Sequence, residues 1–257
     1  MPGSTFVNFG NNGGISVEIS RDSKSFNSFV KNYWNYYREL EKEFISTRKY
    51  VEFSPENWNT YSLEYLKLFQ AICSEIDVVG KAMAGACNSL FNPEDRHNTI
   101  YKWWYEIQNT YFLTDGPFTY MNNSSSPVRF TMAEYKCCIN ELIELQPWKN
   151  FIIVKKGKQS YELKDETSVP HWWIDYTSVK HGRVLPLSDD DNSSNYSRAN
   201  LGNVCSALSA LYILEKAYMD SVGTYDDLSS HIDFSEIFVR RRRYTFDEMD
   251  QIYGNKL

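Results

Sequence analysis

Lys180, His181 and Arg183 lie next to one another in the stretch PHWWIDYTSVKHGR. Histidine is the side chain most readily poised as an acid or base near neutral pH. Flanking cations disfavour its charged form, and they could hold a phosphate and stabilise charge that develops on it. The three residues are therefore suited to cleave a phosphodiester without a metal ion, with His181 as acid or base and the other two steadying the phosphate.

A purely structural interpretation of the same residues stays open. The spacing predicts a short helix from about Pro170 to His181, with Gly182 as a left-handed terminating residue. Cations in the last turn interact favourably with the carbonyl end of the helix dipole, by about 0.3–1 kcal/mol. In this interpretation Arg183 bonds the last carbonyls, and no chemistry is needed to explain it.

Asp77 and Lys81 are the candidate partners of this cluster. They are four residues apart within an apolar stretch, about 60–87, so they share one face of a predicted helix. A charge pair on such a helix is costly unless it is satisfied. Either it orients Lys180, His181 and Arg183 in a catalytic site, or it forms an internal salt bridge with Lys180 or Arg183 that joins the two helices.

The spacing of apolar residues at three and four positions predicts a mainly all-α fold. The fold class is a multi-helix bundle with a small β-hairpin insertion near 151–163, where two short extended runs flank a glycine. The predicted helices cover residues 23–44, 60–87, 92–113, 130–147, 170–181 and 197–222.

The domain organisation is predicted to be simple. Residues 1–21 form an irregular segment, and residues 22–257 form a single helical-bundle domain with a basic and aromatic tail at 231–257. No repeat of fixed period and no low-complexity linker divides the chain.

The net charge, the apolar stretches and the cysteine count argue against several classes of function. The net charge of −6 and the pI near 5.3 argue against binding nucleic acid through overall charge, although a local basic patch is compatible with them. The longest apolar stretches are broken by charges, so no membrane span is predicted. Five cysteines, an odd number, do not resemble a secreted disulfide framework, and a cytoplasmic location is expected.

No cofactor or metal ion is expected from the motifs. The adjacent Cys137 and Cys138 lack the ligand spacing of a zinc site. The glycine-rich FGNNGG near the amino end lacks the lysine and hydroxyl residue that end a P-loop. The remaining cysteines lie on apolar helical faces and are expected in the core.

A second candidate nucleic-acid contact is the run Arg240, Arg241, Arg242 and Arg243, which is followed by Tyr244. Adjacent arginines contact phosphates, and nearby aromatic rings stack on bases. The alternative is a solvated helix end whose charge is balanced by the acidic residues that follow.

A long helix with EIDVVGK, a later helix with KHGR and a final apolar helix together resemble the HEPN superfamily (higher eukaryotes and prokaryotes nucleotide-binding). The resemblance implies a compact helical bundle, often dimeric. It also implies a metal-independent endoribonuclease of a toxin or antiphage type, or an inactive RNA-binding relative. Asp77 and Lys81 match the family's acidic and basic pair, whereas Arg183 follows His181 instead of preceding it.

A non-enzymatic function is the alternative hypothesis. In it the aromatic faces of the helices bind a partner protein or a second copy of the chain, as a homodimer or larger homo-oligomer. RNA cleavage that is lost when His181 is changed would favour the enzyme, and wild-type protein that never cleaves RNA would favour the interaction module.

Overall fold

The computed structural model describes residues 23–114, 129–139, 143–157, 160–187, 194–223 and 235–240, so the segment 1–21 lies outside it. The fold is mainly helical. The helices are α1 (Ser23–Phe29), η1 (Val30–Trp34), α2 (Asn35–Ser46), η2 (Thr47–Lys49), η3 (Pro55–Asn57), α3 (Leu63–Cys87), α4 (Ile100–Ile107), α5 (His171–Gly182), η5 (Asn195–Arg198) and α6 (Leu201–Val222). The strands are β1 (Phe112–Thr114), β2 (Arg129–Thr131), β3 (Cys137–Ile139), β4 (Ile143–Leu145), β5 (Ile153–Lys156), β6 (Ser160–Leu163) and β7 (Phe238–Arg240).

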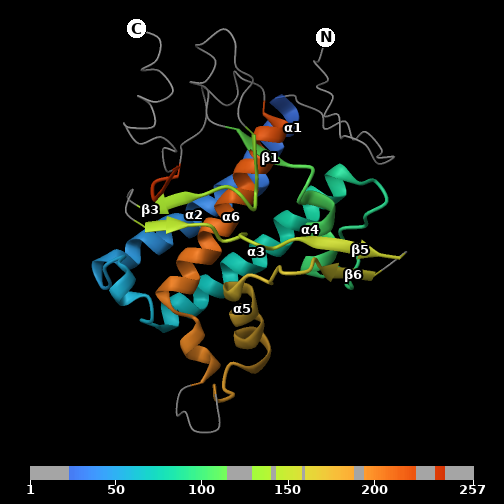
Figure 1. Cartoon of the computed structure of the whole chain (residues 1–257). Helices are drawn as coiled ribbons and strands as arrows, with labels where there is room; N and C mark the ends of the chain where they lie inside the picture. Colours follow the sequence, from blue (N-terminus) through green and yellow to red (C-terminus); the bar gives the residue numbers. More distant parts are fainter. Residues whose placement is uncertain are drawn as a thin grey trace, which may run out of the picture.

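Helices α3 and α6 form the centre of the molecule (Figure 1). Both bury side chains over much of their circumference, as expected for helices surrounded by other elements. Helix α4 packs against α3, and α5 packs against both α3 and α6. The long apolar helix predicted at residues 60–87 is therefore α3, at the centre of the molecule.

Local sequence signals set where the two central helices begin. The Ser62 side chain accepts a hydrogen bond from the backbone N–H of Tyr65, and Asn200 does the same for Asn203. Serine and asparagine are preferred at this position because they satisfy N–H groups that have no partner within the helix. These caps fix the first turns of α3 and α6.

An aromatic cluster anchors α5 to the rest of the core. The buried Trp148 ring stacks on Trp104 with centroids 4.3 Å apart, and Trp172 of α5 meets Trp148 edge to face at 5.2 Å. Both arrangements are favoured by the charge distribution of aromatic rings. The Trp172 indole N–H also donates to the Pro147 carbonyl at 3.0 Å. One face of α5 is thereby fixed inward.

The predicted hairpin near 151–163 is confirmed. Strands β5 and β6 pair antiparallel, with Ile153 opposite Leu163 and Lys156 opposite Ser160. Gly157 follows β5 with φ +73°, a conformation that glycine adopts without steric cost. The hairpin lies against α4 (Figure 1).

The helix predicted at 130–147 is wrong. Residues there form β2, β3 and β4, and β3 is the middle strand of a sheet with the order β4-β3-β7. Cys137, Cys138 and Ile139 are all buried, a pattern typical of a strand covered on both faces. The pairing of Cys138 with Val239 joins segments about a hundred residues apart. Local spacing contains no information on such a partner, and tertiary pairing overrides helical periodicity.

The helix predicted at 92–113 is shorter than expected, since α4 begins only at Ile100. Before it, the Asn92 side chain accepts a hydrogen bond from the backbone N–H of Glu94, and Asp95 accepts one from His97. Asparagine and aspartate make such local turns in competition with the helix. The region around Pro93 is therefore a loop.

Replacing Gly80 by alanine is expected to destabilise the protein, because α3 and α4 approach closely there. An added Cβ would lie 2.6–2.8 Å from atoms of the Trp103 ring. Overpacking costs about 1–3 kcal/mol, against a helix-propensity gain of about 1 kcal/mol. Urea denaturation measures the net loss. In a Trp103→Leu background the same substitution should cost less, and an equal cost in both backgrounds would contradict the clash.

Candidate functional site

Helix α5 carries the predicted phosphate-binding residues on its outer side. Trp172, Asp175, Tyr176 and Val179 are buried, so the opposite face of the helix is turned toward solvent. Lys180, His181 and Arg183 are all exposed. The buried residues thus fix the orientation in which the three cationic residues face the solvent.

The end of α5 differs from the structural interpretation of these residues. The helix continues through Gly182, and among the described glycines only Gly157 has a positive φ, so the predicted left-handed termination is wrong. The Gly182 carbonyl accepts from the Leu185 backbone N–H and from the Asn195 side chain, each at 2.9 Å. The Arg183 carbonyl accepts from the Tyr196 N–H at 3.0 Å. The carbonyls of Gly182 and Arg183 therefore have hydrogen-bond donors other than the side chains of Lys180, His181 and Arg183.

Asp77 and Lys81 form a partly exposed ion pair on α3. The Lys81 Nζ lies 2.5 Å from Asp77 Oδ2, and the buried Trp103 indole N–H donates to Asp77 Oδ1 at 3.0 Å. The side chains are 33% exposed for Asp77 and 22% for Lys81. Both carboxylate oxygens are satisfied from α3 and α4, so the pair is stable without a partner on α5.

Tyr176 links this pair to the basic end of α5. The Lys180 ammonium lies 5.6 Å from the Tyr176 ring centroid, a cation–π geometry. Burial raises the pKa of Tyr176 to about 12, and the Asp77 carboxylate adds to the effect. Lys180 of α5 therefore contacts a tyrosine whose pKa is influenced by Asp77 of α3.

No contact shows the predicted arrangement in which Asp77 and Lys81 orient Lys180, His181 and Arg183. Within residues 23–114 and 160–187, no hydrogen bond or ion pair joins Lys180, His181 or Arg183 to Asp77 or Lys81. The expected internal salt bridge between the two helices is likewise not formed there, since Lys81 occupies Asp77. The cationic cluster and the α3 pair are neighbours around Tyr176 with no direct bond between them.

A histidine–aspartate pair at the start of α5 was missed by the sequence analysis. His171 Nδ1 lies 3.0 Å from Asp175 Oδ2, with the imidazole 81% exposed and the carboxylate 4% exposed. The sequence does contain a signal for this pair, because His171 and Asp175 are four residues apart and therefore share one face of a helix. His171, the histidine of HWWID, was not among the predicted site residues, which came from the KHGR end of the same stretch.

Asp175 is held from three elements. Besides His171 of α5, Arg198 of η5 pairs with its Oδ1, and the Asn203 side chain of α6 donates to its Oδ2 at 2.8 Å. Arg198 also donates to Asn195 at 2.9 Å. A buried carboxylate is tolerated when it is paired and hydrogen-bonded in this way. The network fixes one side of the His171 ring.

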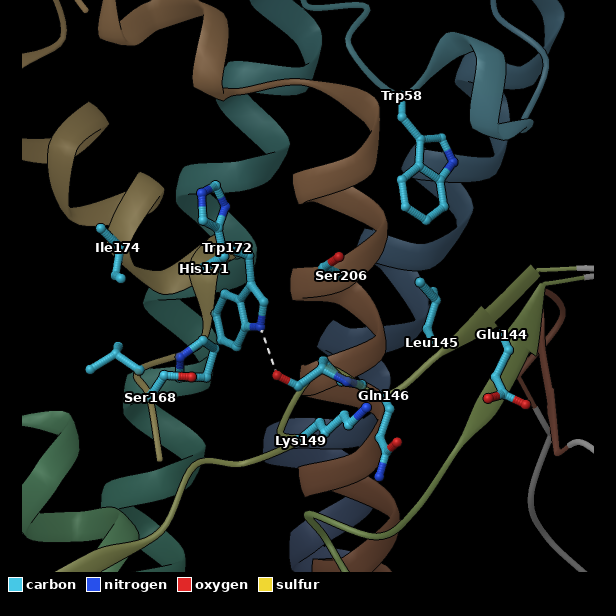
Figure 2. A pocket seen from close by; sticks show the side chains of 13 residues that line it. Trp58, Glu144, Leu145, Gln146, Lys149, Ser168, His171, Trp172, Ile174 and Ser206 are labelled. Atoms are coloured by element: carbon cyan, nitrogen blue, oxygen red, sulfur yellow. Dashed lines mark hydrogen bonds between the residues drawn. The ribbon is translucent and has the colours of Figure 1, made fainter. Parts of the chain in front are cut away.

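His171 lines a pocket of about 570 Å³ (Figure 2). In the view, His171 and Trp172 lie on one side, Trp58 and Leu145 on the other, and Ser206 of α6 between them. Pockets of about 300–1,000 Å³ with a few polar groups are typical small-molecule sites. The pocket and the basic cluster are the two candidate sites.

The second predicted nucleic-acid contact falls mostly outside the described residues. Arg240 ends strand β7, whereas Arg241, Arg242, Arg243 and Tyr244 are not described. For Arg240 the alternative of a helix end is wrong, because β7 pairs antiparallel with β3. Ser235 and Glu236, just before β7, are bound by the buried Glu41 of α2.

All five cysteines are buried and form no disulfide, which confirms the predicted core position of Cys73, Cys87 and Cys205. Burial raises the pKa of the Cys87 thiol to about 12 and raises that of Cys73 well above its usual value. Because the thiolate is the nucleophilic form, this environment disfavours cysteine catalysis.

In the described part of the chain, no grouping of three or more His, Cys, Asp or Glu side chains is suited to hold a metal ion. None of the helices described has the length and apolar character needed to cross a lipid bilayer.

The fold and the two sites define a mainly helical protein with an exposed basic cluster on α5 and a histidine–aspartate pair beside a pocket. Comparison with known proteins found no matching family model, no matching curated protein and no matching solved structure.

Proposed function

We propose that this chain acts on RNA through the exposed end of α5, as a metal-independent endoribonuclease similar to HEPN proteins. Lys180 and Arg183 hold a backbone phosphate, and His181 transfers the proton of the reacting hydroxyl. Asp77 and Lys81, on the adjacent helix, orient the cationic side chains. In an inactive relative the same surface binds RNA without cleaving it.

One observation carries the proposal. Lys180, His181 and Arg183 are exposed, form no ion pair with the described residues, and are not used to cap the helix whose end they occupy. Lys180 contacts the Tyr176 ring, and exposed basic side chains without an ion-pair partner are available to an external anion. Lysine and arginine bind phosphate readily, and arginine does so in a bidentate geometry.

Loss of RNA cleavage is the expected result of changing His181. Purified protein is incubated with total RNA in EDTA, with wild type beside His181→Ala, and fragments are followed on a gel. General acid–base catalysis contributes typically 10²–10⁴-fold, so the variant should be slower by about that factor. Cleavage at the wild-type rate in the variant would remove His181 from catalysis.

RNA binding tests the surface separately from catalysis. The double change Lys180→Gln and Arg183→Gln should weaken binding and reduce the slope of log affinity against log salt by about 1 per phosphate contact. Lys31→Gln, an exposed lysine on η1, is the matched control and should leave the slope unchanged. An unchanged slope in the double variant would contradict the proposed surface.

A second candidate function rests on exposed apolar side chains beside the cluster. Val184 is 84% exposed and Leu185 57%. Adjacent exposed apolar residues favour contact with a protein, either a partner or a second copy of this chain. Light scattering of wild type and of a Val184→Ser, Leu185→Ser variant distinguishes this function, which also predicts no RNA cleavage at any protein concentration.

A further inference from the structure

The backbone that follows α5 is bonded to η5. The Gly182 carbonyl accepts from the Asn195 side chain at 2.9 Å, and the Arg183 carbonyl accepts from the Tyr196 N–H at 3.0 Å. The Asn195 N–H in turn donates to the Leu185 carbonyl at 2.9 Å. Because α5 ends at Gly182, the place of Arg183 depends on these bonds and not on a further helical turn.

The orientation of the Asn195 amide is set by Arg198. The Arg198 Nε donates to Asn195 Oδ1 at 2.9 Å. A guanidinium is only a donor and a backbone carbonyl is only an acceptor. The amide oxygen must therefore face Arg198, and the amide NH2 must face the Gly182 carbonyl. One asparagine thus joins a donor on η5 to an acceptor at the end of α5.

Arg198 is itself held by a buried charge. It pairs with Oδ1 of Asp175, whose side chain is only 4% exposed. The Asn203 side chain of α6 donates to Asp175 Oδ2 and to the Arg198 carbonyl, each at 2.8 Å. The rigid planar guanidinium can serve Asp175 and Asn195 at the same time, which a lysine ammonium does less well. Because Asp175 would be costly to leave unpaired, Arg198 is fixed in one place.

These contacts form one continuous line of hydrogen bonds from the buried face of α5 to its exposed end, through Asp175, Arg198, Asn195 and the Gly182 carbonyl. The line ends at the peptide next to Arg183. Lys180 and His181, in contrast, lie within α5, where the helix itself fixes their backbone. Arg183 is therefore the member of the basic cluster whose position depends on η5.

We propose that Asn195 is a positioning residue for RNA binding, which acts through the Gly182 carbonyl to place Arg183 against a backbone phosphate. This inference rests on the proposed function for the identity of the ligand. Arginine binds phosphate as a bidentate fork, whereas lysine binds it as a point charge. A shift of the backbone at Arg183 therefore weakens its phosphate contact even though the charge of the protein is unchanged.

The RNA affinity of Asn195→Ala, measured by fluorescence anisotropy with a labelled single-stranded RNA, tests the proposal. The Kd should rise about tenfold, the effect of losing one charge-assisted hydrogen bond. Asn57→Ala is the matched control, because Asn57 of η3 also donates its amide to a backbone carbonyl, that of Glu52, at 3.0 Å. The control should bind as wild type does. Equal affinity in wild type and Asn195→Ala would overturn the proposal.

A double-mutant cycle separates the placement of Arg183 from a general loss of structure. In an Arg183→Gln background, Asn195→Ala should cause little further loss of affinity, because the side chain that it places is already gone. In a Lys180→Gln background its full effect should remain. Equal losses in the two backgrounds would show that Asn195 does not act through Arg183, and they would overturn the proposal.

Amide hydrogen exchange measures the placement in the absence of RNA. In Asn195→Ala the Leu185 and Tyr196 amides should exchange faster, because they donate to the carbonyls of Gly182 and Arg183. Unchanged exchange at both amides would overturn the placement whether or not RNA binds. Wild-type protein that binds no RNA, with faster exchange in the variant, would instead remove the proposed function and with it the role of Asn195 in RNA binding.

Discussion

Replacing Glu215 with leucine is expected to raise the free energy of unfolding by about 1–3 kcal/mol, the usual cost of a buried polar group without a partner. Glu215 lies on α6, fully buried, and neither carboxyl oxygen has a hydrogen-bond partner within the described structure. Burial raises its pKa well above the ordinary value, and the charge of Glu75 on α3 adds to the effect. Burial therefore favours the neutral carboxyl, whose oxygens are still unsatisfied.

The sign of the pH dependence follows from that raised pKa. In the unfolded chain Glu215 ionises near its ordinary pKa of about 4.3. The folded protein keeps its proton to a higher pH, so the unfolded state binds fewer protons in between and stability falls as pH rises. Burial also raises the pKa of Glu75 to about 7, which extends the loss through neutrality. Tyr33 and Tyr218 each have their pKa raised by burial, with a further contribution from Glu215 and, for Tyr33, from Glu75.

Urea denaturation at pH 5, 7 and 9 separates the cost of burying an unsatisfied carboxyl from the additional cost of ionising it. Wild type should lose stability from pH 5 to pH 9. Glu215→Gln should lose less with pH because it cannot ionise, yet it should gain little at pH 5 because its amide is also unsatisfied. Glu215→Leu should gain at every pH. A wild-type profile that is flat from pH 5 to pH 9 would show that the two carboxyls do not titrate abnormally.

The helical part of the fold was predictable because its signals are local. The apolar positions of residues 60–87 and 197–222 repeat at helical spacing, and Ser62 and Asn200 mark where α3 and α6 begin. The β5-β6 hairpin was predictable for the same reason, since its strands are joined by a short turn around Gly157.

The β4-β3-β7 sheet was not predictable from spacing. Tyr135, Cys138 and Ile139 have the three- and four-residue spacing of a helix, and the strand results from pairing with residues 238–240. The candidate site also has features that depend on local sequence and features that depend on distant residues. The exposure of Lys180, His181 and Arg183 depends on the burial of Trp172, Tyr176 and Val179 on the other face of α5. The burial of Asp175 depends on Arg198 and Asn203, which come from two other elements.

Replacing Glu41 with alanine is expected to destabilise the protein by about 3–5 kcal/mol, the effect of removing one partner from a buried ion pair. Glu41 of α2 is fully buried and pairs with Arg38, and it also accepts from the hydroxyls of Tyr37 and Ser235. The Glu236 backbone N–H donates to it at 3.1 Å. Without the carboxylate, Arg38 keeps only the exposed carboxylate of Glu236, 2.6 Å away, and the chain before β7 loses its hydrogen bonds to Glu41.

Two measurements distinguish this anchor from a simple loss of packing. Thermal or urea denaturation gives the overall loss, and Glu39→Ala is the matched control. Glu39 is on the same helix but exposed and paired only with exposed Lys42, so its loss should cost less than about 0.5 kcal/mol. Hydrogen exchange should also accelerate at residues 236–240 in Glu41→Ala, because β7 is held both by this carboxylate and by β3. Unchanged exchange there, in a variant that remains folded, would mean that pairing with β3 alone fixes the strand that ends at Arg240.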